Sequence, residues 1–519
     1  MNKILGKILK GIERNNFYIK EYNTNNKILV VDRSLPQSVL SSLFCSQIIN
    51  QEFKYNIKLI SYLSEKNFII KLYKSFGVKD FENLNLNFKK DILNFFFAII
   101  IFFYHIPRIL ISSKDYFINK YKISDILIGD LIYDSFIRNK LRFKENMKYN
   151  LYFYKLIFLT IFKLIKLENL FRNNNFKCVI SHTHVYASLS SLSIRLAIKN
   201  KIKVLMPIGG RIIVYKKSAD YLKSELSITK NELKKICKER KFWKKELEIY
   251  LEIRRFGKIK GTTAYDAYNK TKKISSKIIL KKLKYDKAKY SKVGLFATHC
   301  LSDANHAGGN FFFNDYYSHF VETVKLIKED NRTLWIIKTH PTSSYYNEED
   351  FIFKQLKKID SKNIILCPKN IKPYQLLKLC EKIVTCRSTI AIEAAELGKK
   401  IIVCGKNFFT GFRITKDCFS YKEYKKNLLN NKTEKLNKKE ILLAKKIFYF
   451  LAFKDSFHKS SIIPISNQLF VNFKDKKLKQ NFFNRKKVFD IFSDNFLHKN
   501  LIKDDYFKFC KKKILSELR

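Results

Sequence analysis

The chain has 519 residues, of which 46% are hydrophobic, and it carries a formal net charge of +56. Single cores stop growing near roughly 250–300 residues, so this length predicts two large lobes, and the apolar content is that of a globular protein. The lysines are spread over nearly the whole chain without a helix-turn-helix, zinc-finger or aromatic RNA-binding signature, so we expect no nucleic-acid partner. The charge favours other polyanions, namely anionic lipid headgroups, acidic glycans and nucleotide sugars, or else reflects lysines on solvated faces.

The ten cysteines form no CxxC pair. Several of them, including Cys178, Cys367 and Cys404, lie in apolar runs, which predicts reduced, buried thiols in a cytosolic protein. The N-terminus is basic but lacks an apolar stretch long enough for a signal peptide. We therefore expect a cytoplasmic protein.

Two apolar segments of the first lobe bear on membrane contact. Residues 92–111, ILNFFFAIIIFFYHIPRILI, nearly reach the ~20 residues that span a bilayer. His105, Pro107 and Arg108 interrupt this run, which favours a buried or interfacial helix over a spanning one. The run from Leu151, LYFYKLIFLTIFKLIK, carries a lysine every few residues. It predicts a core helix with snorkelling lysines or a helix lying on an anionic surface.

The first lobe, predicted over residues 1–286, alternates short apolar strands with helices. Strands are expected at Lys27–Asp32, Lys177–His182 and Lys203–Gly210, and a helix at Ser188–Asn200. This alternation predicts a Rossmann-like lobe with helical insertions and a parallel sheet covered on both faces. The lysine-rich, helical residues 225–286 close the lobe.

The second lobe, predicted over residues 287–430, has the more regular pattern. Strands are expected at Val293–His299, Thr333–His340, Asn363–Pro368, Lys382–Cys386 and Lys399–Gly405, with helices at Tyr317–Lys328, Glu348–Lys358, Pro373–Glu381 and Thr389–Leu397. This pattern predicts a second, compact Rossmann-like unit. Residues 431–519 read as a helical basic tail, in which Glu440–Phe453 has helical apolar spacing, and we expect the tail to pack back on the first lobe.

A Lys-Thr-His-Pro motif ends one strand of the second lobe. Ligands bind beyond the carboxyl ends of the strands in an open parallel sheet. Lys338 and His340 can both donate to phosphate oxygens there, and Pro341 fixes the following loop. The alternative is a surface lysine beside a structural histidine.

A second motif, Arg387 to Glu393, follows the next-but-one strand. Ser388 could cap the helix that begins there while free backbone N–H groups and the neighbouring Arg387 and Thr389 face an anion. Glu393, about one turn further, could reach the ribose hydroxyls of a nucleotide. A plain capping box is the alternative. The two motifs together, about fifty residues apart on strand tips, indicate a nucleotide donor site more strongly than either alone.

The loop after the first strand of this lobe carries His299, Asp303 and His306. Asp303 is a candidate catalytic carboxylate and His306 a proton-handling partner, with His299 nearby in the cleft. His and Asp also bind metals, but no further cluster has matching spacing, so we expect no metal. The third interpretation is a hydrogen-bonded loop that has no catalytic role.

The first lobe offers candidates for an acceptor site or for the cleft. They are His182 and His184 after one strand, Gly209, Gly210 and Arg211 after the next, and Asp130 and Asp134 in the string IGDLIYD. The glycines allow close backbone approach, and Arg211 could bind an anionic substituent. For the two aspartates, a turn with a capping Asp is an equal alternative.

Five strings together resemble a known family. AxHxxSDAxH, NDYY, KTHP, STxAIEAAxLGKxxI and NFFTGF, all within residues 293–419, resemble the capsule and surface-polysaccharide synthesis proteins, including the bacterial capsule Kdo transferases. A thinner resemblance covers residues 125–211. It implies a GT-B fold, with two Rossmann-like lobes facing a central cleft, that requires neither a metal nor another cofactor.

The resemblance also implies residue roles. Related CMP-sugar transferases place the His-Pro and Ser-Thr pairs on the nucleotide and phosphate of the donor, which implies donor binding by His340, Pro341, Ser388 and Thr389, with Lys338 and Glu393 as partners. Arg387 and the stretch NFFTGFRIT depart from the FYxGWGLT form of the capsule Kdo enzymes. The donor could therefore carry another CMP- or CDP-linked group, and wider kin include polyol-phosphate transferases that use CDP-glycerol.

The sequence thus predicts a metal-independent glycosyltransferase at the inner face of the cytoplasmic membrane. It would move Kdo or another acidic sugar from a CMP- or CDP-type donor to a growing surface polysaccharide or lipid-linked acceptor. The alternatives are a polyol-phosphate transferase, a nucleotide-sugar epimerase, and a basic scaffold of a polysaccharide export assembly.

Overall fold

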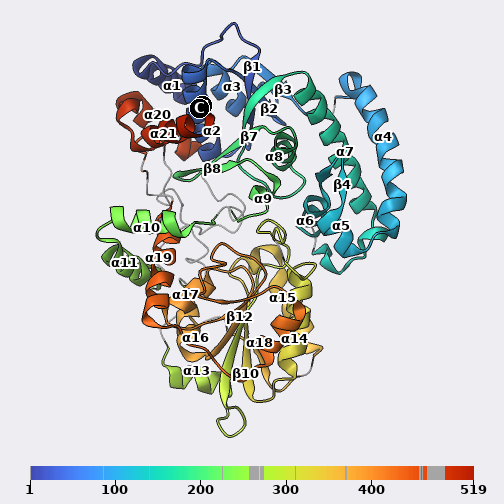
Figure 1. Ribbon diagram of the computed structural model, residues 1–519, viewed down its shortest axis with the longest axis vertical. Coiled ribbons are helices and arrows are strands. Elements are labelled where there is room, and N and C mark those ends of the chain that lie inside the picture. The colour runs from blue at the N-terminus through green and yellow to red at the C-terminus, as the bar shows by residue number, and fades with distance from the viewer. Residues whose placement is uncertain are drawn as a thin grey trace. The chain divides into compact units, whose positions relative to one another are not determined.

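The structure is a computed structural model with two compact units (Figure 1). It describes residues 2–85, 87–138, 141–224, 226–255, 268, 274–309, 311–359, 361–368, 371–454, 458, 460–463 and 485–519. Unit 1 comprises Met1–Phe136, Glu145–Tyr221 and Lys454–Arg519, and unit 2 comprises Ile137–Lys144 and Leu222–Phe453.

Unit 1 contains a six-stranded sheet in the order β3-β2-β1-β6-β7-β8. Its strands are β1 (Asn26–Val31), β2 (Asn56–Ser61), β3 (Asp80–Asn83), β6 (Asn175–Ile180), β7 (Lys203–Ile208) and β8 (Arg211–Tyr215). Counted along the chain, this is the order 3-2-1-4-5-6 of a doubly wound dinucleotide-binding fold. All neighbours are parallel except β7 and β8, because only two residues connect these two strands.

Unit 1 also contains helices and one small hairpin. They are α1 (Asn2–Asn15), α2 (Pro36–Phe53), α3 (Phe68–Ser75), α4 (Phe88–Ile111), α5 (Lys114–Lys120), α6 (Gly129–Arg138), α7 (Leu151–Arg172), α8 (Leu189–Lys199), α9 (Ser218–Tyr221), α20 (Arg485–His498) and α21 (Asp505–Leu518), with a small hairpin of β4 (Lys122–Ile123) and β5 (Ile126–Leu127). The 3-10 turns η2 (Met147–Tyr149) and η7 (Leu501–Lys503) complete the unit.

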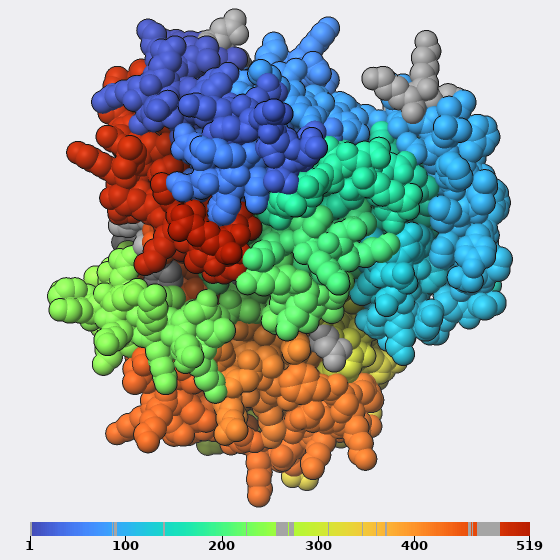
Figure 2. Space-filling view, turned by 45° about the horizontal axis from the view of Figure 1, so that its top comes forward, coloured from blue at the N-terminus to red at the C-terminus, as the bar shows by residue number. Residues whose placement is uncertain are grey.

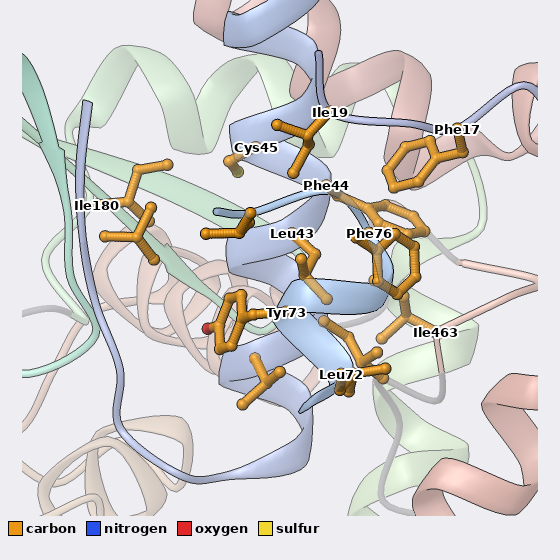
Figure 3. Close-up of a cluster of buried hydrophobic side chains, with 14 of the residues drawn as sticks. Phe17, Ile19, Leu43, Phe44, Cys45, Leu72, Tyr73, Phe76, Ile180 and Ile463 are labelled. Atoms are coloured by element: carbon orange, nitrogen blue, oxygen red, sulfur yellow. The ribbon is translucent and has the colours of Figure 1, made fainter. Parts of the chain in front are cut away.

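The core of unit 1 contains residues from both ends of the chain. Phe17, Phe44 and Phe76 lie together with Ile463 and the fully buried Tyr73 (Figure 3). Helix α20 runs along α1, and α21 packs on α2. A Cβ at Gly11 of α1 would lie 2.6 Å from the Phe496 ring, so the close approach of α1 and α20 requires glycine there.

Unit 2 contains a second six-stranded sheet with the same strand order, β11-β10-β9-β12-β13-β14, and every pair in it is parallel. Its strands are β9 (Lys292–Ala297), β10 (Thr333–Lys338), β11 (Ile364–Leu366), β12 (Lys382–Thr385), β13 (Ile402–Cys404) and β14 (Lys416–Cys418). Its helices are α10 (Lys230–Glu239), α11 (Trp243–Arg255), α13 (Ser276–Lys282), α14 (Tyr316–Lys328), α15 (Glu348–Lys357), α16 (Pro373–Leu379), α17 (Ile390–Glu396), α18 (Tyr421–Leu429) and α19 (Lys438–Phe453), with the 3-10 turns η1 (Arg142–Lys144) and η3 (Ser343–Tyr346). The predicted α/β class with two Rossmann-like sheets is confirmed.

The boundaries between the two units differ from the boundaries that we predicted at residues 286 and 430. Helices α10 and α11 belong to unit 2 because they pack on α19, which itself packs on α17. The Tyr449 hydroxyl donates to Glu246, and the Trp243 and Tyr449 rings are 6.0 Å apart. Only the part of the tail from Lys454 onward belongs to unit 1. Residues 225, 256–267, 269–273 and 464–484 of the predicted segments lie outside the described residues.

The two apolar segments of the first lobe both form helices, α4 and α7. Helix α7 buries eight residues, including Phe153, Ile157 and Leu164. Of the two predicted alternatives, a core helix and a helix on an anionic surface, the structure shows the core helix. Among the described helices, α4 alone is long and apolar enough to cross a membrane, over Asp91–Ile111. Only 17% of its most apolar window is buried, so the expectation of a buried helix is wrong for α4.

Candidate functional site

Strand order reverses in unit 2 between β9 and β12, because β10 lies on one side of this pair and β13 on the other. Parallel sheets bind ligands at such a point, beyond the carboxyl ends of the strands. A pocket with an empty volume of about 500 Å³, open solvent included, lies there. It is lined by Arg254, Tyr268, Ala297, Thr298, Lys338, Thr339, His340, Pro341, Pro373, Ser388, Thr389, Ile390 and Glu393. We call it the switch-point pocket, and all of its residues belong to unit 2.

The tips of β9 and β10 place a hydroxyl and an ammonium in this pocket. Lys338 pairs with Ala297 in the parallel register, and the Thr298 N–H donates to the Lys338 carbonyl over 3.0 Å. Thr298 Oγ1 is buried and makes no hydrogen bond within the described part of the chain. An unsatisfied buried hydroxyl costs free energy, so this atom is suited to bind a ligand that enters the pocket.

His340 lines the pocket as a neutral imidazole. The Thr342 N–H lies 3.3 Å from His340 Nδ1, and Thr342 Oγ1 is 2.8 Å away, so Nδ1 accepts and the proton resides on Nε2. The ring keeps part of its surface open to the pocket yet lies deep among protein atoms. This burial, with a smaller contribution from His299, lowers the pKa of His340 to about 3. At neutral pH the ring therefore has one N–H donor, at Nε2, and no charge.

Behind His340 lies a stack of aromatic rings. The centre of the His299 ring is 5.4 Å from that of His340 at an interplanar angle of 15°, and 4.1 Å from that of Tyr316 at an angle of 26°. His299, predicted as a cleft residue, thus supports the position of His340. It is not itself among the residues that line the pocket.

Ser388 and Thr389 reach the pocket from the loop between β12 and α17. The N-cap residue of α17 is Thr389, whose side chain makes no capping hydrogen bond, and Ser388 Oγ lies 3.4 Å from the Ile390 N–H. The predicted capping by Ser388 is therefore reduced to one long contact. Since α17 has only seven residues, the site is built on these hydroxyl side chains rather than on a helix end.

Glu393 is held by two partners within the pocket wall. Its Oε1 accepts from Arg254 over 2.6 Å, and its Oε2 accepts from the Tyr268 hydroxyl over 2.6 Å. Burial, together with the nearby Glu393 charge, keeps the Tyr268 pKa well above its usual value, so the phenol stays a donor. Glu393 therefore joins α17 to α11, and only its remaining lone pairs could serve the predicted contact to a ribose.

The charges of the pocket suit an anion. Lys338 and Arg254 each contribute one positive charge, Glu393 one negative charge, and His340 none, so the net charge of the lining is positive. Lys338 Nζ is half-buried and has no hydrogen-bond or ion-pair partner within the described residues. An ammonium in this position would strongly attract a phosphate because the pocket walls are of low dielectric.

Arg387, predicted to bind the donor, lies outside the pocket lining. Its guanidinium donates to the carbonyl oxygens of Lys406, Asn305 and Gly309, and it lies 5.2 Å from the centre of the Phe311 ring. The structure therefore gives Arg387 the role of a brace that joins three loops at the strand tips.

The candidate catalytic pair lies on the loop after β9. Asp303 is about half exposed and lies 3.4 Å from Arg138, while His306 is buried and its Nε2–H donates to the Asn314 carbonyl over 3.1 Å. Neither lines the switch-point pocket, although the negative charge of Asp303 partly offsets the lowering of the His340 pKa. Asp303 is thus close enough to influence the site and open enough to meet solvent.

A buried carboxylate fixes this loop. Glu348 accepts from the Leu301 N–H, the Ser302 N–H and the Ser302 hydroxyl over 2.6–2.9 Å, and from the Ser343 hydroxyl over 3.1 Å. It thereby connects the loop after β9 to the loop after β10. No group of three or more His, Cys, Asp or Glu is placed to hold a metal ion among the residues that the structure describes.

The predicted acceptor residues of unit 1 are engaged within the fold. Asp130 on α6 forms a buried, bidentate pair with Arg195 over 2.6–2.7 Å. His182, at the tip of β6, donates from Nδ1 to the Pro207 carbonyl over 2.9 Å and lies 2.6 Å from the Ser42 hydroxyl. Burial lowers the pKa of His182 to about 3, so it is a neutral connector of the strand tips.

The other first-lobe candidates are also part of the architecture. Gly209 and Gly210 form the two-residue turn between β7 and β8, which contains Gly209 at a φ of 57°, and Arg211 begins β8. His184 is buried edge-on against Tyr215, and Asp134 is buried on α6. The glycines therefore form the turn that leads β7 directly back into its antiparallel neighbour β8, and their close approach to a ligand stays a prediction.

Seven residues of the pocket lining were not among the predicted site residues, namely Arg254, Tyr268, Ala297, Thr298, Thr339, Pro373 and Ile390. Thr298 directly follows an apolar strand, so the strand-tip rule that selected Lys338 would have found it. Arg254 and Tyr268 come from a helical, lysine-rich segment remote in sequence from either motif, and no pattern marks them.

Comparison with known proteins identifies the segment that carries this site. Residues 252–449 match the family described as capsule polysaccharide biosynthesis protein. A search of curated protein sequences finds no significant match.

Three solved structures are similar to the chain at low identity. Thermosulfurimonas dismutans KpsC, a beta Kdo 2,4 transferase, is 15% identical with a TM-score of 0.31, over 52% of this chain and 79% of that one. Methanocaldococcus jannaschii UDP-GlcNAc 2-epimerase is 14% identical with a TM-score of 0.21, over 82% of this chain and 99% of that one. The Neisseria meningitidis UDP-GlcNAc 2-epimerase is 11% identical with a TM-score of 0.21, over 95% and 99%.

The resemblance inferred from the five sequence strings and the family match cover the same region, the β9–β14 sheet and its pocket. Residues 252–449 are therefore similar to the capsule polysaccharide biosynthesis family.

Proposed function

We propose that the chain is a glycosyltransferase that transfers a sugar from a nucleotide-activated donor to a growing surface polysaccharide or a lipid-linked acceptor. One observation carries the proposal: Lys338, His340, Thr298 and the Ser388–Thr389 hydroxyls line a single pocket at the switch point of the unit 2 sheet. Such a set of donors suits the phosphate of a nucleotide.

The chemistry follows from those donors. When the bond between sugar and phosphate breaks, negative charge develops on the departing phosphate oxygen. The Lys338 ammonium would stabilise that charge, and His340 Nε2–H and the hydroxyls would donate to the same phosphate group. Because the positive charge comes from side chains, we propose that transfer needs no metal and no cofactor.

For the donor we propose a CMP- or CDP-type nucleotide, with Kdo or another acidic sugar as the group transferred. Asp303 is the proposed catalytic carboxylate, because it is open to solvent and its charge reaches His340. His306, whose Nε2–H is engaged by Asn314, would act on protons only through Nδ1 or after a change of its hydrogen bonds. A lipid-linked acceptor and the net charge of +56 support a location at the cytoplasmic face of the membrane.

Transfer activity tests the proposal. His340→Ala should abolish transfer from the cognate donor while leaving the thermal unfolding temperature unchanged, because the ring lies at the pocket rather than in the core. Lys325→Ala, on the exposed face of α14, is the matched control and should retain activity. Full turnover by His340→Ala would refute the assignment of the pocket.

The same reaction mixture distinguishes an epimerase. With a nucleotide sugar and no acceptor, a transferase leaves the sugar's NMR spectrum unchanged apart from slow hydrolysis. Interconversion of two sugar epimers without an acceptor would replace the transferase proposal with the epimerase alternative.

A further inference from the structure

Helix α4 of unit 1 presents a continuous apolar face to solvent. Its exposed apolar residues are Ile92, Leu93, Phe96, Phe97, Ile100, Phe103, Tyr104, Leu110 and Ile111. At 100° per residue these positions fall within one half of the helix circumference. We call this set the α4 ridge, and Figure 2 shows the α4 region, in light blue, at the molecular surface. An exposed apolar patch of this kind marks an interaction site rather than an ordinary soluble surface.

The opposite side of α4 is bound to its own unit. Asp91 pairs with Lys166 of α7 over 2.8 Å, Asn94 accepts from Asn169 over 2.9 Å, and the Phe95 ring is 5.5 Å from Phe158. These three residues of α4, with the buried Ala98, His105 and Ile109, occupy the arc away from the ridge. Helix α4 is therefore attached along its length, and the ridge is the side of the helix that the fold leaves uncovered.

This attachment excludes a helix that crosses the bilayer. A spanning helix is surrounded by lipid, which would remove Asp91 from Lys166 and His105 from the Tyr121 hydroxyl, 2.6 Å away. Placing unpaired ionisable groups in hydrocarbon costs free energy. A helix that lies in the plane of the interface keeps these contacts and inserts only its apolar face.

Basic residues border the ridge. Arg108 lies over the Tyr104 ring at 4.3 Å, and Lys148 donates to the Leu110 carbonyl, next to the exposed Tyr149 and Leu151. Residues 88–122 contain six lysines and arginines against two aspartates. A second copy of this chain would bring the same basic residues and another large positive charge to the contact, which opposes self-association. Anionic headgroups complement both the apolar face and its basic border.

We propose that the α4 ridge is a membrane-docking surface that lies in the headgroup region of an anionic bilayer, with Phe97, Ile100 and Phe103 inserted among the acyl chains. The inference specifies the surface behind the proposed membrane location, but it rests on unit 1 alone and needs no assumption about transfer chemistry.

Vesicle flotation without nucleotide tests the ridge separately from the enzyme activity. The full chain should float with vesicles of phosphatidylcholine and phosphatidylglycerol, and at least tenfold less with phosphatidylcholine alone. The triple variant Phe97→Ser, Ile100→Ser, Phe103→Ser should lose at least tenfold of the anionic binding. The matched control Phe242→Ser, Phe353→Ser, Ile502→Ser changes three other exposed apolar residues and should bind as the wild type.

A second measurement decides the matter if the triple variant does not fold. Tryptophan at the ridge, in Phe103→Trp, should be quenched by brominated lipid in anionic vesicles, whereas Phe242→Trp should not. The inference is overturned if the wild type does not float, if the folded triple variant floats equally well, or if ridge tryptophan is not quenched. It is also overturned if the wild type forms a dimer that the triple variant abolishes, since the ridge would then be a protein interface.

Discussion

The two sheets of this chain have the same strand order but differ at the point where that order reverses. At the switch point of unit 2, between β9 and β12, Thr298 Oγ1 makes no hydrogen bond among the described residues. Lys338 is half-buried there and lines the pocket. In unit 1 several side chains at the corresponding point, between β1 and β6, are hydrogen-bonded within the unit. Asp32 accepts from the Ser34 and Ser61 hydroxyls over 2.8–3.0 Å, and His182 joins Ser42 to Pro207.

The difference shows that topology alone does not make a binding site. Both sheets bring strand tips together, and in unit 2 the tips place Lys338, His340 and Thr298 on the wall of one pocket. Residues with the same chemistry, such as His182 and His340, therefore have opposite expected roles, the first in stability and the second in binding.

The strongest test of this comparison exchanges histidine for alanine in both units. His182→Ala removes two buried hydrogen bonds and leaves a cavity, so it should lower the free energy of unfolding by about 2–4 kcal/mol. His340→Ala should change it by less than about 1 kcal/mol, because the ring lines a pocket and its hydrogen bonds are both local contacts to Thr342. Urea denaturation followed by circular dichroism measures both, and equal losses would break the comparison.

A large effect on binding is expected from the ammonium. Lys338→Met keeps the length of the side chain but removes its charge, and should weaken nucleotide binding roughly 10- to 100-fold, as expected for hydrogen bonds to charged groups. Titration calorimetry with the tightest nucleotide found in a thermal-shift screen measures the change. Lys325→Met, which alters an exposed lysine on α14, serves as control.

A smaller effect should follow from one hydroxyl. Thr298→Val is close to isosteric and removes an oxygen that has no partner among the described residues. Nucleotide binding should weaken about 3- to 10-fold, while the unfolding temperature stays the same or rises slightly, since an unsatisfied polar atom is removed. A falling unfolding temperature with unchanged affinity would mean that Thr298 has a structural role.

A further test uses pH, and its effect should be alike in the two units. Burial lowers the pKa of both His182 and His340 to about 3, against 6.5 in the unfolded chain. Below pH 6.5 the unfolded chain binds protons that the folded chain does not, so stability falls as the pH falls from 6.5 toward 3. His340→Gln should show a shallower loss of stability over that window in urea denaturation at several pH values. The pH dependence of nucleotide affinity near pH 6.5 should be the same in His340→Gln and the wild type, since the nucleotide phosphate titrates there in both, and an additional inflection in the wild type alone would show that His340 titrates.

The sequence predicted the second sheet well because its strands are buried on both faces. The runs at 293–299, 333–340 and 382–386 have apolar centres and meet the observed strands within two residues at each end. The first sheet was harder to predict. In β2, NIKLIS, a lysine interrupts the apolar run, and β3, DFEN, is only four residues long, so neither carries a recognisable signal.

The pocket was predictable only in part. Lys338, His340 and Ser388 follow apolar strands and so obey the strand-tip rule. Arg387 also follows an apolar strand, but its guanidinium donates to the backbone carbonyls of Lys406 and Asn305. No sequence pattern reveals such contacts. Arg254 was missed because tertiary packing of α11 brings it to α17. The exposed face of α4 was not predicted because composition gives a helix's apolar character but not which of its sides the fold covers.

Nucleotide binding to the whole chain tests the central claim most directly. Calorimetric titration with CMP and CDP should show binding of at least one, weakened by Lys338→Met and by Thr298→Val and unchanged by Lys325→Met. Absence of binding by any nucleoside mono- or diphosphate, or binding that is indifferent to both pocket variants, would contradict the account.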